Sequence, residues 1–83
     1  MNFQIRKRGG GLEPWNIEKT INSVAVSGAS IKMSEAMGKL IEAWAEKIAK
    51  DGVVSSLQVR DKVVEILAIV DEMAAEAYKA FKK

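Results

Sequence analysis

The sequence of 83 residues contains no cysteine and no histidine. Without cysteine the protein cannot form a disulfide, a thiolate nucleophile or a Cys/His zinc site, and without histidine it has no imidazole for acid–base catalysis. No apolar run approaches the ~20 residues that a transmembrane helix needs, and none follows the charged N-terminus as in a signal peptide. We therefore expect a cytoplasmic protein with no membrane partner.

The sequence also has little net charge, a formal +2 at pH 7, which disfavours nucleic acid as a partner. Hydrophobic residues make up 48% and charged residues 29% of the chain, which is the balance of a folded protein. A chain of this length is expected to form one domain, residues 1–83. Its thirteen cations are unevenly spread, because three of them, Arg6, Lys7 and Arg8, are consecutive.

Residues 2–8, NFQIRKR, show the alternation of a β-strand. The alternation assigns side chains to two faces: Phe3, Ile5 and Lys7 to one, Arg6 and Arg8 to the other. Three glycines at 9–11 predict a turn, and residues 12–15, LEPW, predict a short returning strand with Pro14 at an edge or an end. The N-terminal segment is therefore predicted to be a β-hairpin.

Capping residues and helical periodicity predict two helices after the hairpin. Asn16 is a good N-cap for a helix over residues 17–27, which ends at Gly28. Ser34 is the expected N-cap of a second helix, over residues 35–50.

The last third of the chain predicts a strand and a helix. Residues 53–54, two valines, predict a small third strand that pairs with the hairpin. Ser55 and Gln58 have the spacing of a capping box, which starts a helix. Since no glycine or proline interrupts the pattern that follows, periodicity alone predicts one long helix over residues 56–82, bent near Asp71.

Large aromatic side chains are expected in the core: Phe3, Trp44, Tyr78 and Phe81. An apolar stripe of Ile17, Ile21 and Ala25 along the first helix leaves two alternatives open. The stripe is either buried within the domain or exposed as a contact for a partner protein.

The cationic end of the hairpin is expected next to the start of the first helix. The polar residues brought together there are Lys7, Arg8, Glu13, Asn16 and Lys19. Cations, backbone N–H donors and the helix dipole together suit a polyphosphate. A cation in the first helical turn is otherwise unfavourable by roughly a few tenths of a kcal/mol, so Lys19 also favours a bound anion. The alternative is a solvated basic strand end and an ordinary turn, since neither common glycine-rich phosphate motif is present.

Three segments resemble the ATP-cone domain: KRGGGLEPWNIEK at 7–19, VVSSLQVRDKVVEIL at 53–67 and AAEAYKAF at 74–81. ATP-cones are allosteric regulatory modules that bind ATP or dATP, most often at the N-terminus of ribonucleotide reductase catalytic subunits, where they set activity through subunit assembly. The resemblance implies an α+β, mainly α fold, a four-helix bundle capped by a small three-stranded β-sheet. It also implies that the last helix is split near residues 70–71.

The resemblance further implies a set of nucleotide-binding residues: Lys7, Arg8, Glu13, Asn16, Lys19, Thr20, Ser55 and Arg60. Lys7 and Arg8 match the phosphate-contacting pair, whereas Trp15 is expected to pack under the hairpin rather than stack on a base. ATP or dATP, with or without Mg²⁺, would be a ligand and not a substrate, because the sequence shows no catalytic-base arrangement and no metal cluster. The implied partner is a ribonucleotide reductase catalytic domain or another protein.

Some residues depart from the family pattern. Gly9 and Gly11 stand where the family has Asp and a longer side chain, and Thr20 stands where Ile or Leu is usual. These departures leave open an alternative, a cone-like protein-interaction domain that has lost nucleotide binding. Nucleic-acid binding, which occurs in repressor relatives with a zinc ribbon, is disfavoured by the absence of cysteine.

Overall fold

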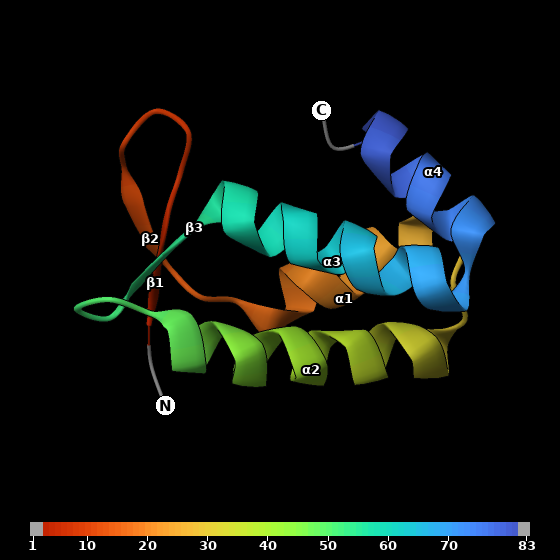
Figure 1. Cartoon of the computed structure of the whole chain (residues 1–83), viewed down its shortest axis with the longest axis horizontal. Coiled ribbons are helices and arrows are strands. Elements are labelled where there is room, and N and C mark those ends of the chain that lie inside the picture. Colours follow the sequence, from red (N-terminus) through yellow and green to blue (C-terminus); the bar gives the residue numbers. More distant parts are fainter. Residues whose placement is uncertain (1–2, 82–83) are drawn as a thin grey trace.

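A computed structural model describes residues 3–81 of the chain. Within this range the fold is α+β and mainly α, with four helices and one small sheet of three strands, as expected (Figure 1). The elements in chain order are β1 (Gln4–Arg6), β2 (Leu12–Pro14), α1 (Ile17–Val26), α2 (Ile31–Ile48), β3 (Val53–Ser55), α3 (Ser56–Val70) and α4 (Glu72–Phe81). None of these helices is both long and apolar enough to cross a membrane.

The sheet lies at one end of the helices, on the left in Figure 1. Its strand order is β2-β1-β3, with β1 antiparallel to β2 and parallel to β3. The predicted hairpin and the third strand are therefore confirmed. The hairpin turn is closed by two backbone hydrogen bonds, in which Lys7 N–H donates to Gly11 O at 2.8 Å and Gly10 N–H donates to Lys7 O at 2.9 Å. Gly10 has a φ of 95°, a conformation that favours glycine.

Helix α1 packs closely on α2 at Gly38. A Cβ atom at position 38 would lie 2.6 Å from Ile21 Cγ1 and 3.2 Å from Ile17 Cγ1. Two residues of the apolar stripe, Ile17 and Ile21, thus face α2 within the domain, and all three of its residues are half-buried, which favours the buried alternative over a partner contact. Asn16 caps α1 as predicted, because its Oδ1 accepts a hydrogen bond from Glu18 N–H at 3.0 Å.

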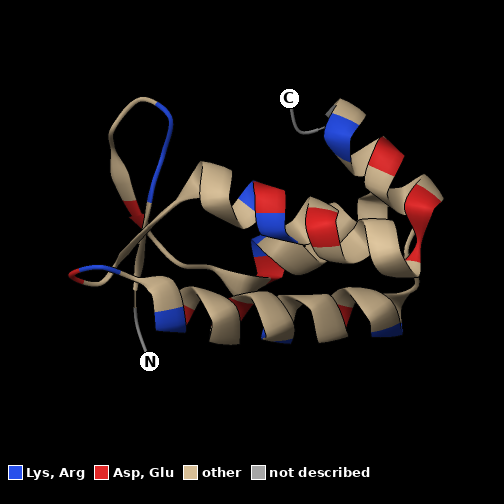
Figure 2. Cartoon of the chain, viewed as in Figure 1, with Lys and Arg blue, Asp and Glu red and all other residues tan. Residues whose placement is uncertain are grey.

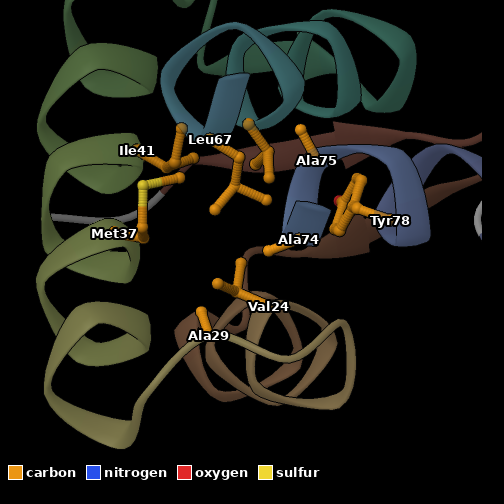
Figure 3. Close-up of a cluster of buried hydrophobic side chains, with 9 residues drawn as sticks. Val24, Ala29, Met37, Ile41, Leu67, Ala74, Ala75 and Tyr78 are labelled. Carbon is orange, nitrogen blue, oxygen red and sulfur yellow. The ribbon is translucent and has the colours of Figure 1, made fainter. Parts of the chain in front are cut away.

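Two connected clusters form the core. The larger one joins α1, α2, α3 and α4, and most of its members appear in Figure 3: Val24, Ala29, Met37, Ile41, Val63, Leu67, Ala74, Ala75 and Tyr78. The smaller one lies under the sheet and contains Phe3, Ile5, Ala45 and Val54. Trp15 packs against both clusters and stacks on Phe3 with ring centroids 5.1 Å apart, so its packing under the hairpin is confirmed. That it does not stack on a base stays a prediction. Of the other aromatic residues, Phe3 and Tyr78 are buried, Trp44 is half-buried, and the side chain of Phe81 lies outside the described residues.

The predicted start of α2 is wrong by four residues. The N-cap is Ser30, whose Oγ accepts a hydrogen bond from Met33 N–H at 3.1 Å. Ser34 lies inside the helix, is fully buried and donates its hydroxyl to Ser30 O at 2.8 Å. Its backbone N–H also donates to Ser30 O at 2.8 Å, as expected for a residue inside the first turn. The helix also ends two residues earlier than predicted, at Ile48.

The prediction of a single long helix from periodicity is also wrong, because the helix is interrupted at Asp71. This residue leaves the helical conformation with φ −159° and ψ 87°, while its N–H still donates to Leu67 O at the end of α3. Its Oδ1 accepts a hydrogen bond from Ala74 N–H at 3.0 Å, which caps the start of α4. The break turns α4 so that Ala74, Ala75 and Tyr78 are buried in the core. The split implied by the family resemblance lies at this position.

Candidate functional site

An open cleft with a volume of about 560 Å³ lies between the hairpin, the start of α1 and the start of α3. Seven of the eight residues proposed from the sequence line it: Lys7, Arg8, Glu13, Asn16, Lys19, Thr20 and Arg60. Ser55 does not line it; it is the N-cap of α3 in the expected capping box, where its N–H donates to Gln58 Oε1 at 3.2 Å, and its hydroxyl also accepts a hydrogen bond from Leu57 N–H at 3.1 Å. Residues that are distant in sequence thus meet in one cleft.

The cleft concentrates positive charge. Four cationic side chains and one carboxylate line it, a formal balance of +3 compared with +2 for the whole chain. The charge comes from three elements, and Figure 2 shows cationic residues on the arm of the hairpin nearer to α3. The charged residues outside the lining sum to −1, nine cations against ten carboxylates, so the net positive charge of the chain is concentrated in this cleft, where it attracts anions.

Of the three consecutive cations of the hairpin, Lys7 and Arg8 line the cleft and Arg6 does not. Strand β1 ends at Arg6, so the alternation does not extend to Arg8, which lines the cleft together with Lys7. The prediction that Lys7 and Arg8 face opposite sides is therefore wrong. Arg6 is outside the lining, and its guanidinium donates a hydrogen bond to Gly10 O at 3.2 Å within the turn.

The start of α1 contributes to the same cleft. Asn16 and Lys19 line it, and the buried residue Thr20 lines it one position further. The first N–H groups of a helix have no intrahelical acceptor. In α1 the N–H group of Glu18 donates instead to the Asn16 side chain. The positive end of the helix dipole therefore lies beside the hairpin cations, where it adds to their attraction for an anion.

Glu13 holds two of the cations in the absence of a ligand. Its Oε1 lies 3.7 Å from Lys7 Nζ and 3.4 Å from Lys19 Nζ. The two lysine side chains are 60% and 67% exposed, so each pair is weak and contributes about 1 kcal/mol or less. The lysines are consequently able to reach a ligand.

The start of α3 forms a wall that the sequence did not suggest. Apart from Arg60, this wall consists of Ser56, Leu57 and Val59, and α1 adds Ser23. These residues escaped prediction because they form part of the cleft only once β3 pairs in parallel with β1 and brings the start of α3 to the hairpin. Of these residues, only Ser23 could have been predicted from helical periodicity, because it lies four positions after Lys19 and three after Thr20 and so shares their face of α1.

Tyr78 of α4 lines the inner end of the cleft and belongs to the core. Burial raises the pKa of its phenol above 10.0, and the nearby Arg60 guanidinium offsets part of this rise. The phenol is therefore neutral at physiological pH and presents both a donor and an acceptor.

Two apolar side chains outside the cleft lining are nearly fully exposed. They flank the turn from α3 to α4, where Ile69 is 80% and Met73 84% exposed. Single exposed apolar residues are common on proteins, but two nearly bare side chains beside one turn are a feature of contact surfaces.

Within residues 3–81, no group of acidic side chains could hold a metal ion. Neither the comparison with protein-family models nor that with curated proteins gives a match.

Proposed function

We propose that the protein is an allosteric regulatory module that binds an adenine nucleotide, ATP or dATP, with or without Mg²⁺. The observation that carries the proposal is the cleft, in which cationic, apolar and hydroxyl-bearing side chains line one volume. A volume of about 560 Å³ is within the range of small-molecule sites.

The cationic side suits a polyphosphate. Lys7, Arg8 and Lys19 line it beside the capped start of α1. Arginine binds a phosphate through a fork of N–H donors, lysine binds it as a point charge, and the helix start adds its dipole. No single one of these features would carry the proposal, but their convergence at one end of the cleft supports it.

The other lining residues suit a nucleoside. Leu57 and Val59 present apolar surface there, and the hydroxyls of Ser23, Ser56 and Tyr78 can exchange hydrogen bonds with a base or a sugar. A ligand with a charged tail and a flat, polar-edged ring fits this division better than an inorganic anion does.

The nucleotide would act as a ligand whose binding is coupled to assembly. Coupling requires that the nucleotide bind more tightly to one assembly state of a partner than to another. The resemblance of the hairpin motif to ATP-cones supports a ribonucleotide reductase catalytic domain as that partner, with this chain as its N-terminal activity-regulating domain or as a stand-alone relative.

Isothermal titration calorimetry with ATP and with dATP in the presence of Mg²⁺ tests the proposal. We expect micromolar binding, and about tenfold weaker binding for Lys7→Ala and for Lys19→Ala, because each variant loses one charge-assisted phosphate contact. Lys39→Ala is the matched control, since Lys39 is an exposed lysine on α2 outside the cleft. Unchanged affinity in both cleft variants would refute the proposed site.

A second candidate function is a protein-interaction domain that does not bind nucleotide. The exposed Ile69 at the end of α3 and Met73 at the start of α4 favour it, and neither residue lines the cleft. Titrations that show no heat up to millimolar nucleotide, together with unchanged tryptophan fluorescence, would favour this candidate over the first.

A further inference from the structure

Glu13 is the one acidic side chain among the described residues that line the cleft. It is positioned by the sheet, because Glu13 of β2 pairs across the strands with Ile5 of β1. Cross-strand partners project from the same face of a sheet, and Ile5 lines the cleft as well. Its side chain is only 30% exposed, so the carboxylate has limited freedom to turn away.

The carboxylate occupies the space between two phosphate-binding candidates. One oxygen atom, Oε1, is the partner of both Lys7 Nζ and Lys19 Nζ. An ionised carboxylate only accepts hydrogen bonds, as does a fully ionised phosphate oxygen. A bare polyphosphate must therefore compete with Glu13 for the same ammonium groups and is also repelled by its charge.

A nucleotide meets the same carboxylate differently. Its sugar hydroxyl groups and the amino group of its base are hydrogen-bond donors, and a carboxylate accepts strong hydrogen bonds from such groups. A nucleotide can thus offset the repulsion that a bare polyphosphate cannot offset. Discrimination of this kind arises from a group that disfavours the wrong ligand.

We infer that Glu13 is a specificity-determining residue, which opposes the binding of bare polyphosphates in the cleft and so selects nucleotides. The selection of nucleotides rests on the proposed function, whereas the opposition to bare polyphosphate follows from the geometry of the three side chains. The two parts can therefore be tested separately.

The experiment is calorimetric titration with inorganic tripolyphosphate and with ATP, both without divalent cations. The proteins are the wild type, Glu13→Gln, and Glu18→Gln as a matched control. Glu18 is an exposed carboxylate in the first turn of α1 that does not line the cleft, so its variant makes the same change in net charge. We expect tripolyphosphate to bind Glu13→Gln about tenfold more tightly than the wild type, the size expected when two exposed ion pairs no longer compete.

The same titrations give the outcomes that decide the inference. ATP is expected to bind Glu13→Gln no more tightly than the wild type, and Glu18→Gln should change either affinity by no more than about twofold. Equal affinity of the wild type and Glu13→Gln for tripolyphosphate, or no binding by either, overturns the inference. An equal gain for ATP and tripolyphosphate overturns the selectivity. Failure of the wild type to bind ATP refutes the proposed function, while the tripolyphosphate comparison still decides the effect of Glu13.

Discussion

The contact between α1 and α2 at Gly38 allows a quantitative prediction for Gly38→Ala. Two effects of opposite sign act at this position. Alanine is favoured over glycine inside a helix by about 1 kcal/mol. The added Cβ would, however, lie 2.6 Å from Ile21 Cγ1, and isoleucine is branched at Cβ and cannot turn aside easily. Overpacking of this kind costs about 1–3 kcal/mol. We therefore expect Gly38→Ala to lower the free energy of unfolding by about 1 kcal/mol.

A double-mutant cycle with Ile21→Ala isolates this clash. Removing the Ile21 side chain beyond Cβ leaves space for a methyl group at position 38, so only the helix propensity of alanine remains. In the Ile21→Ala background, Gly38→Ala should therefore raise the free energy of unfolding by about 1 kcal/mol. The change of sign corresponds to a coupling energy of about 2 kcal/mol between the two positions.

Urea unfolding followed by circular dichroism measures the four proteins of the cycle, and equal m-values would validate the comparison. Stabilisation by Gly38→Ala in both backgrounds, with no coupling, would refute the close packing of α1 on α2. The consequence extends to the cleft, because this packing positions the start of α1 and with it Asn16 and Lys19.

Two further predictions concern α4. Asp71→Ala should lower the free energy of unfolding by about 1 kcal/mol because Ala74 N–H loses its cap, whereas Asp71→Asn should lose little; equal losses in urea unfolding would contradict a capping role. Tyr78→Phe should change the pH dependence of the free energy of unfolding. The phenol is neutral in the folded and the unfolded protein well below pH 10, but as the pH rises it ionises first in the unfolded protein, where its pKa is lower. The wild type should therefore lose stability relative to Tyr78→Phe as the pH rises above 10.0 toward the folded-state pKa, and parallel stability curves for the two proteins would contradict this.

Local signals predicted the elements whose boundaries depend on nearby residues. The hairpin was predicted from alternation and three glycines, and α1 from a cap and a glycine stop. The start of α2 was missed because Ser30 and Ser34 are both good caps, and only packing decides between them. Periodicity did not predict the interruption at Asp71, because the sequence there has neither glycine nor proline. The interruption depends instead on the Asp71 carboxylate, which caps the next helix.

The cleft was predicted on one side and missed on the other. Lys7, Arg8 and Lys19 lie within one short segment, so a hairpin followed by a helix was enough to bring them together. The wall that contains Leu57 and Val59 arises from a parallel strand pair about fifty positions apart in sequence, between residues 4–6 and 53–55. Pairing over such a separation is set by the tertiary fold and leaves little trace in local patterns.

Nucleotide binding in the cleft is tested most directly by a two-dimensional ¹⁵N–¹H NMR titration of the protein with dATP in the presence of Mg²⁺. Binding in the cleft predicts saturable shifts of the amide signals of residues 7–9, 16–20 and 56–60, with little change at the α3–α4 turn, residues 69–73. No shifts up to millimolar dATP, or shifts confined to residues 69–73, would contradict the account.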